Sequence, residues 1–404
     1  MADALQDIKV VDLSRILAGP WASQMLADMG AQVIKIEQPN KGDDTRFWGP
    51  PFIKERNESQ PPQSAYFHCT NRNKQSIAID IKQKTGQQIV QDLIVDSDVV
   101  IENFKVGGLV KYGLDYPTLN KLNPNLIYCS ITGFGQTGPA SSKLVYDAMV
   151  QAEGGLMSIT GETDGAPMKV GVALVDIMAG LYSCNAILAA LMARKHIKKG
   201  QYIDIALLDV QAATLANQGM NYLATGKNPE RHGNGHPNIV PYQAFKTVDG
   251  DMILAIGNDS QFQKFCQLLN APELADNPDY NTNEQRVHNR VTLIPLIAKH
   301  MMNHSTDWWV ERLEALGVPC GRVNTIKQVF NHEQIKYRNL VKEIPDRNGK
   351  LIKTISSPIN LSETPLKYIS ASPDLSQHAM EILSNELDYS DSKIRKLIET
   401  GIVG

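Results

Sequence analysis

Apolar residues in the first part of the chain follow two alternating patterns. Short, nearly continuous apolar runs, which predict buried strands, are separated by longer segments whose apolar positions recur at helical spacing. The predicted strands cover residues 8–14, 31–37, 75–81, 98–104, 125–135 and 200–209, and the helices between them include 20–30 and 85–97. Strands that alternate with helices of this length are typical of βαβ units and a mainly parallel sheet. The pattern therefore predicts an α/β fold with a large Rossmann-like domain.

The pattern changes after residue 225. Residues 226–238 are polar and rich in Gly and Pro, which is typical of a domain junction or an active-site loop. Residues 241–257 then predict a hairpin that turns at Asp249-Gly250, and helical stretches follow at 261–269 and 306–316. We therefore expect a large domain at 1–225, a smaller α+β domain at 226–329, and a segment at 330–404 that returns to the large one.

One long apolar segment, residues 170–195, carries a single carboxylate near its start, Asp176. Because Asp176 and Asn185 interrupt it, we interpret the segment as a buried helix and not as a membrane span. An Asp ahead of an apolar helix usually satisfies free N–H groups of the first turn and the helix dipole. On the pattern alone this capping role is the preferred interpretation, and a catalytic role needs support from elsewhere.

Composition narrows the functional classes. The length of 404 residues indicates more than one domain. Forty Lys and Arg against 43 Asp and Glu give a net charge of −3, which favours neither nucleic acid nor an anionic membrane as a partner. The N-terminus lacks a basic region followed by an apolar core, so we expect no secretory signal.

The cysteines and histidines do not predict a metal or disulfide site. The five cysteines are odd in number, far apart and without a CxxC pair. His300 and His304 are four residues apart but lack the Glu of an HExxH motif. We expect no metal and a reducing, cytoplasmic setting.

The first strand–helix turn argues against a dinucleotide cofactor. Glu37 ends the second predicted strand, where many dinucleotide-binding domains have an acidic residue. However, residues 14–23 contain one glycine in place of the GxGxxG fingerprint, and no GxxxxGK[ST] loop occurs in the chain. Nicotinamide and nucleoside-triphosphate chemistry are both disfavoured.

Several segments in a fixed order do suggest a family. They are LAGPWASQMLADMGAQVIKIEQP, GDDTR, NRNKQSIAIDIK, IENF, SITGFGQTGP, YDAMVQAEGGLMSITG, VDIMAG and HGNGHPNIVPYQAFKTVDG. Together they resemble the family III CoA-transferases, chiefly the glutarate (dicarboxylate) group through NRNK, SITGFGQTGP and IVPYQAFKT. The resemblance covers nearly the whole chain, and it implies an interlocked homodimer and coenzyme A as a substrate, with no cofactor.

The resemblance reverses the interpretation of Asp176, because the family has its catalytic aspartate there. Its carboxylate would attack an acyl-CoA thioester, form a mixed anhydride and then an aspartyl-CoA thioester, and finally pass CoA to an acceptor acid. The further positions that the resemblance implies in substrate and CoA binding are Ile16, Leu17, Ala18, Lys82, Asn103, Phe104, Lys111, Tyr146, Gly233, Asn234 and Gly235. Arg72 and Lys74 are additional candidates for phosphate contacts, with a solvated surface role as the alternative for each.

Some positions depart from the family pattern. Gln38 stands where formyl-CoA transferases have an Arg, Leu144 stands where they have a Lys, and their glycine run is longer than GNGHP. These departures disfavour formyl-CoA or oxalate as substrates. We expect a succinyl-CoA-like donor and a dicarboxylate acceptor.

A dicarboxylate acceptor needs a partner for its unreacted carboxylate. The candidates are Arg46, Arg231 and His236, although Arg46 is better interpreted as the partner of Asp43 or Asp44 in a structural turn.

Two other functions have weaker support in the sequence. An α-methylacyl-CoA racemase shares this fold, but it has a histidine at the Tyr146 position, and a tyrosine with a pKa near ~10 is poorly suited to exchange an α-proton. A non-enzymatic CoA-binding regulator would be expected to have lost the carboxylate of Asp176.

Overall fold

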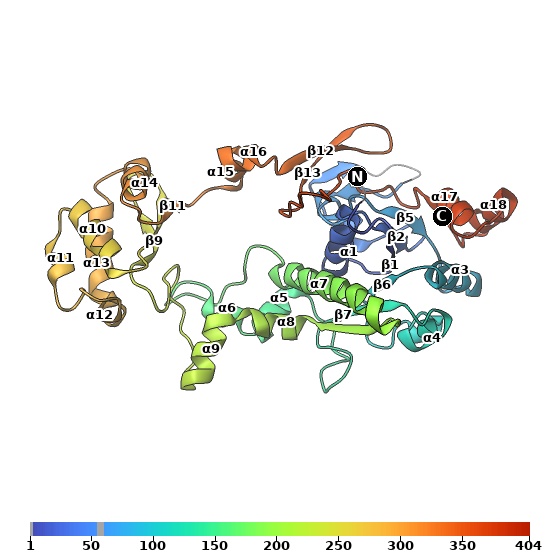
Figure 1. The fold of residues 1–404 in the computed structure, drawn as a ribbon, viewed down its shortest axis with the longest axis horizontal. Helices are drawn as coiled ribbons and strands as arrows, with labels where there is room; N and C mark the ends of the chain where they lie inside the picture. Colours follow the sequence, from blue (N-terminus) through green and yellow to red (C-terminus); the bar gives the residue numbers. More distant parts are fainter. Residues whose placement is uncertain (1–2, 55–59) are drawn as a thin grey trace. The chain divides into compact units, whose positions relative to one another are not determined.

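The computed structural model describes residues 3–54 and 60–404 (Figure 1). Contacts divide the chain into two compact units. The first consists of Met1–Gly155, Val170–Met220 and Lys336–Gly404, and the second of Leu156–Lys169 and Asn221–Ile335. The segment Leu156–Lys169 thus belongs to the second unit, although the sequence pattern placed it within the large domain.

A six-stranded sheet forms the centre of the first unit. Its strands are β1 (Lys9–Asp12), β2 (Gln32–Glu37), β5 (Gln75–Ala78), β6 (Val99–Glu102), β7 (Ile127–Thr132) and β8 (Tyr202–Ala206). They pair in the order β5-β2-β1-β6-β7-β8, and every pairing is parallel. All six predicted strands are confirmed. The expectation that β8 is buried was wrong, because β8 ends the sheet and exposes Asp204.

Helices cover both faces of this sheet, as the continuous apolar strands require. One face packs against α1 (Ala18–Asp28), α5 (Asp147–Glu153), α7 (Leu174–Ile197) and α8 (Leu207–Thr214). The other packs against α3 (Lys84–Val95), α4 (Tyr116–Leu122), α17 (Ala379–Asn385) and α18 (Asp391–Glu399). The strand order matches the doubly wound Rossmann arrangement, and its switch point lies between β1 and β6. Ligands of such folds bind at the carboxyl ends of the strands near this point.

Helix α7 is the long apolar segment seen in the sequence. By length and composition alone it could cross a membrane, but core helices pass the same test. It packs closely against α1, since a Cβ at Gly180 would lie 2.8 Å from the carbonyl oxygen of Ala18. Glycine is required at this crossing, and the contact identifies α7 as a core helix.

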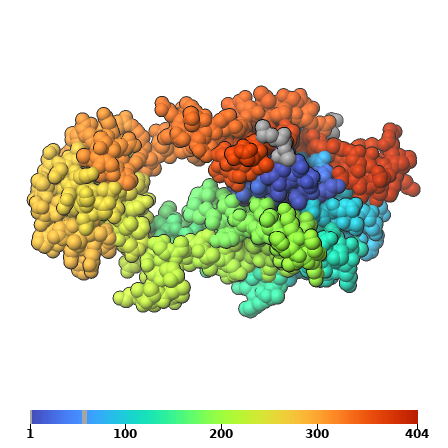
Figure 2. Space-filling view, viewed as in Figure 1, coloured from blue at the N-terminus to red at the C-terminus, as the bar shows by residue number. Residues whose placement is uncertain are grey.

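The C-terminal segment completes the first unit. Its backbone is tied to the residues just after β5 and to the end of α1 by hydrogen bonds from Asp80 N to Ile402 O (2.9 Å) and from Lys367 N to Asp28 O (3.0 Å). In the space-filling view its orange-red residues lie against the blue N-terminal residues (Figure 2). Smaller elements of this unit are η1 (Asp44–Phe47), β3 (Phe52–Lys54), β4 (Gln63–Ser64), α2 (Ala65–His68), η2 (Val110–Tyr112), β12 (Val341–Pro345) and β13 (Leu351–Ile355).

The second unit has a separate core. The predicted hairpin is confirmed as β9 (Tyr242–Lys246) and β10 (Asp251–Ala255), and β11 (Cys320–Arg322) adds a third antiparallel strand. Buried side chains such as Phe262 and Trp309 join this sheet to the surrounding helices. Its helices are α6 (Leu156–Ile159), α10 (Asp259–Leu268), α11 (Glu273–Asp276), α12 (Asn283–His288), α13 (Arg290–Met301), α14 (Thr306–Ala315) and α15 (Ile326–Asn331). Helices α9 (Ala216–Thr225) and α16 (Glu333–Tyr337) begin in one unit and end in the other.

Candidate active site

Asp176 lies in the first turn of α7, but it does not cap the helix. The N-cap residue is Ala173, which provides no side-chain hydrogen bond. The carboxylate of Asp147, at the start of α5, accepts the backbone N–H groups of Val175 (2.8 Å) and Asp176 (3.3 Å). The capping role expected for Asp176 is therefore performed by Asp147. Among the described residues, none donates a hydrogen bond to the Asp176 carboxylate, which is left free to react.

The surroundings of Asp176 favour its neutral form. Burial, followed by the nearby charge of Asp147, raises the pKa of Asp176 to about 7. A carboxylate with so high a pKa is more basic, and therefore more nucleophilic, than an ordinary aspartate. Near neutral pH a substantial fraction therefore remains ionised.

Two tyrosines accompany Asp176. Tyr146 precedes Asp147 in the chain as the N-cap residue of α5, and it is 63% exposed. Tyr66 was not identified from the sequence. Burial and the charge of Asp176 raise its pKa, and its ring packs edge-on against Trp48 with centroids 5.2 Å apart. No local motif marks Tyr66, because only the tertiary fold brings α2 towards α7.

A cavity of about 180 Å³ lies at the carboxyl ends of β1, β2, β5 and β6. It brings together Lys82 and Phe104 from the predicted set, with Arg15 and Gln38. The guanidinium of Arg15 lies over the ring of Phe104, 5.6 Å from its centroid. Lys111 is exposed and lies over the ring of Tyr112, which lines the same cavity. Lys82 and Phe104 thus lie at the edge where a doubly wound fold binds ligands.

The turn between β1 and α1 carries the predicted residues Ile16, Leu17 and Ala18. Leu17 and Ala18 are buried at the start of α1, whereas Ile16 is partly exposed and has a φ of +74°. A left-handed conformation in a β-branched residue costs on the order of 1–3 kcal/mol. Asn103 holds the preceding residue from both sides, accepting from Arg15 N (2.9 Å) and donating to Arg15 O (2.7 Å). Asn103 therefore orients this turn.

Arg72 and Lys74 are not surface cations. Arg72 is buried and forms a bidentate pair with Asp28. Lys74 is fully buried, with its ammonium 3.1 Å from Asp12, and it also donates to Pro20 O and Asn71. Both proposed roles, phosphate contact and solvated surface charge, are inconsistent with these buried positions.

The three candidate partners for a distal carboxylate of the acceptor also have other contacts within the protein. Arg46 is buried and pairs with Glu37 at 2.7 Å, not with Asp43 or Asp44 as expected. Arg231 donates to the backbone carbonyls of residues 158, 162 and 165. His236 stacks on Tyr242, and burial and the nearby Arg290 lower its pKa, so it is neutral near pH 7. None of them presents a free cation in this structure, within the described residues.

The predicted glycine loop lies in the second unit. Gly233 N donates to Gly161 O (3.1 Å) and Gly235 N to His232 O (2.8 Å), while Asn234 is exposed. Gly233 has a φ of +57°, and a Cβ there would lie 3.1 Å from the Glu162 carboxylate. The loop is therefore packed on the segment Leu156–Lys169, which explains why that segment belongs to the second unit.

Comparisons with known proteins show what the chain is similar to. A family model described as CoA-transferase family III matches residues 5–379. A succinate–glutarate CoA-transferase of Agrobacterium fabrum is 50% identical over 380 residues, which cover 94% of this chain and 95% of the relative. A human succinyl-CoA:glutarate CoA-transferase is 42% identical, covering 99% of this chain and 90% of the relative. The crystal structure of a CAIB/BAIF family protein from Brucella suis superimposes with a TM-score of 0.85 at 48% identity, covering 96% of this chain and 100% of that one.

Proposed function

Since the chain belongs to CoA-transferase family III, we propose that it transfers CoA from a succinyl-CoA-like donor to a dicarboxylic acid, with Asp176 as the nucleophile. The observation that carries the mechanism is the Asp176 carboxylate, which has a raised pKa and accepts no hydrogen bond from the described residues. The substrates are supported by similarity to glutarate CoA-transferases over nearly the whole chain.

The reaction proceeds through four displacements at acyl carbons. The Asp176 oxygen attacks the thioester carbon, the C–S bond breaks, and a mixed anhydride and CoA thiolate form. The thiolate attacks the Asp176 carbonyl, expels the donor acid and leaves an aspartyl-CoA thioester. The acceptor carboxylate displaces the thiolate to give a second anhydride. The thiolate then attacks the acceptor carbonyl and regenerates the Asp176 carboxylate, so no net proton is consumed.

The raised pKa of Asp176 makes the first displacement less costly. An ordinary aspartate, with a pKa near ~3.9, would displace a thiolate of pKa ~8.5 at a cost on the order of 6 kcal/mol. With the pKa at about 7, the gap falls to about 1.5 units and the cost to about 2 kcal/mol. Burial of Asp176 thus lowers the free-energy cost of the first displacement.

The cavity beside the turn after β1 suits the nucleotide end of CoA. Its edges carry Arg15 and Lys82, with Lys111 next to Tyr112. Lys82 and Lys111 are available for the phosphates, whereas Arg15 already pairs with Asp44 at 2.9 Å. Gln38 lines the same cavity, and because it is uncharged it supplies no ion pair there.

A racemase of the same fold is the second candidate. It would need an acid–base partner for Asp176 at the Tyr146 position, where the phenol is a poor base near neutral pH. Incubation with a 2-methylacyl-CoA in deuterium oxide should therefore give no Asp176-dependent exchange of the α-proton. Rapid deuteration would favour the racemase.

The proposal is tested by an acceptor screen. Succinyl-CoA, acetyl-CoA and butyryl-CoA are supplied as donors against mono- and dicarboxylic acids, and product thioesters are measured by mass spectrometry. We expect the highest rates for succinyl-CoA with a dicarboxylate such as glutarate. Asp176→Ala should abolish transfer while the thermal transition is kept. Preference for monocarboxylates or carnitine would refute the acceptor class, and full turnover by Asp176→Ala would refute the nucleophile.

We also propose a homodimer in a cytoplasmic setting. Within the most apolar stretch of α7 only 44% is buried, and large apolar side chains such as Tyr182 and Met192 are exposed on this helix. A second copy that covers this face would remove it from water. Light scattering should then give about twice the chain mass of 44.6 kDa, and a monomer would contradict the proposal. Five free cysteines support a reducing compartment.

A further inference from the structure

The backbone of the turn Ser14–Leu17 is held by side chains from four other places in the first unit. Asp12 accepts Ser14 N (2.9 Å), and Lys35 donates to Ser14 O (2.9 Å). Asn103 holds both the N–H and the carbonyl of Arg15. The N–H of Ile16 points at the carboxylate of Asp43, 3.3 Å and 3.2 Å from its two oxygens. Three successive residues of the turn are therefore fixed by groups outside it.

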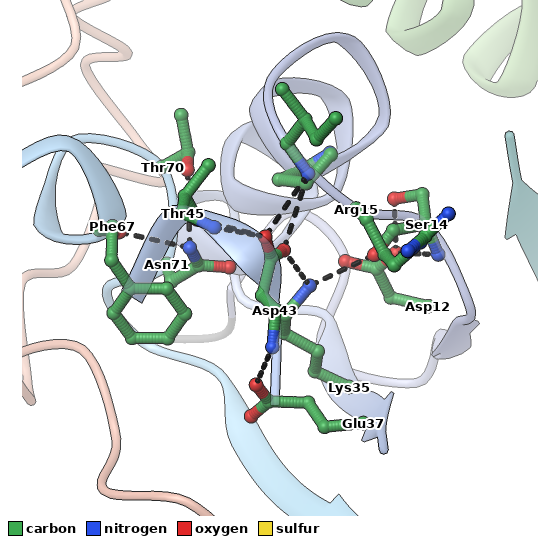
Figure 3. Close-up of polar contacts among 12 residues, drawn as sticks. Asp12, Ser14, Arg15, Lys35, Glu37, Asp43, Thr45, Phe67, Thr70 and Asn71 are labelled. Carbon is green, nitrogen blue, oxygen red and sulfur yellow. Dashed lines mark hydrogen bonds and ion pairs between the residues drawn. The ribbon is translucent and has the colours of Figure 1, made fainter. Parts of the chain in front are cut away.

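Asp43 connects these contacts. Its carboxylate accepts from Thr45 N (3.0 Å) and Thr45 Oγ1 (2.8 Å) and pairs with Lys35 at 3.0 Å. Its own N–H donates to Glu37 (2.9 Å). Figure 3 shows Asp43 at the centre, with dashed lines to Lys35, Thr45 and Glu37. A side chain fixed by so many partners has little freedom to rotate, so its oxygens are rigidly placed for Ile16.

The charges around Asp43 are buried and balanced. Burial opposes ionisation of Asp43, but Lys35 and the Thr45 N–H outweigh it and hold its pKa at about 2. Lys35, fully buried, is shared between Asp43 and the carbonyl of Ser14. Asp43 is thus a permanent anion at any physiological pH, and the hold on the turn is charge-assisted.

The contacts around Asp43 do more than stabilise the fold. Ile16 adopts a left-handed conformation that an isoleucine avoids when unconstrained. Asp43 also lines the cavity that contains Arg15, Lys82 and Phe104. Strained backbone that persists beside a ligand site is held there by its surroundings, and here the holding group is Asp43.

We propose that Asp43 is a positioning residue for acyl-CoA binding, which holds the Ile16 turn in its binding conformation through the Ile16 N–H and the Asp43–Lys35 ion pair. The inference rests on the proposed function, because that function makes the turn a CoA contact. Asp43 acts through the turn and needs no contact with the substrate.

The test compares two buried carboxylates after the same chemical change. Asp43→Asn removes the negative charge that holds the turn. Asp28→Asn removes the negative charge of the equally buried ion pair with Arg72, which lies away from the turn. The Kd of free CoA is measured by calorimetry well below both melting temperatures, with kcat and KM for succinyl-CoA alongside. Both variants should melt earlier than the wild type. Only Asp43→Asn should raise the Kd and KM, by at least about tenfold, with kcat at saturating succinyl-CoA within about threefold.

Equal Kd values for the two variants would overturn the inference. If Asp43→Asn does not fold, Thr45→Val decides, because it removes one donor to Asp43 without leaving a buried charge unpaired. A two- to threefold rise in the Kd of CoA then supports the inference, and an unchanged Kd overturns it. Wild type that binds CoA but transfers it to no acid refutes the proposed function alone, whereas wild type that does not bind CoA refutes both.

Discussion

The turn after β1 and the glycine loop of the second unit are both backbone segments that the family resemblance implies in acyl-CoA handling, but they are held differently. The turn is fixed by buried, charged side chains, Asp12, Lys35 and Asp43. The loop is held by backbone hydrogen bonds and by Arg231, which donates to carbonyls in bonds exposed to solvent. Water can replace contacts of the second kind at little cost, whereas buried charges have no substitute partner. We therefore expect the turn to stay in place and the loop to move more readily.

The largest loss of stability should come from removing one partner of the buried ion pair beneath the turn. Lys74→Met leaves Asp12 without its buried ammonium partner, and we expect the free energy of unfolding to fall by about 3–5 kcal/mol. Urea unfolding measures this change. The control is Lys41→Met, because Lys41 forms an exposed pair with Asp44 that should contribute no more than about 1 kcal/mol. Equal effects of the two substitutions would contradict the comparison.

A smaller effect on stability but a clear effect on chemistry is expected in the loop. Arg231→Ala removes the donors to the carbonyls of Glu162 and Gly165 and should change the free energy of unfolding by less than about 1 kcal/mol. Since the family resemblance implies that this loop handles acyl-CoA, we expect hydrolysis of acyl-CoA to rise severalfold relative to transfer when the loop is loosened. The ratio of free CoA to product thioester measures it, and Arg231→Lys, which keeps part of the donor set, should fall between.

An unchanged ratio of hydrolysis to transfer in Arg231→Ala, together with a loss of several kcal/mol in stability, would make the loop as rigid as the turn.

The smallest expected effect is a shift in the pH dependence of kcat/KM, which follows the ionisation of Asp176. Its pKa is raised to about 7 by burial and by Asp147, so kcat/KM should rise with pH as the carboxylate forms. Asp147→Asn keeps an acceptor for Val175 N–H but removes the neighbouring charge, so the pKa of Asp176 falls and the rise moves to lower pH. Glu153→Gln, an exposed change on the same helix, should leave the profile in place. Superimposed profiles for Asp147→Asn and wild type would show that Asp147 does not act on Asp176.

The elements of the fold were predictable because they depend on local periodicity. Six parallel strands, the hairpin at Asp249-Gly250 and the helix that contains Asp176 all follow from patterns within a few residues. The partners of charged residues were less predictable. Arg72 and Lys74 stand in a polar stretch that suggests surface cations, yet both are buried in ion pairs. The sequence pattern around a cation cannot show that a carboxylate distant in the chain lies within ion-pair distance of it.

Sequence by itself determined the α/β class, the family resemblance and the position of Asp176, since each rests on residue order and short-range spacing. Only the tertiary structure decided that Asp147 caps α7 and leaves Asp176 free, that Tyr66 lies near the Asp176 carboxylate, and that Asp43 holds the Ile16 turn. Those facts depend on desolvation and on contacts between distant segments, because burial changes the energy of a charge only once the chain has folded around it.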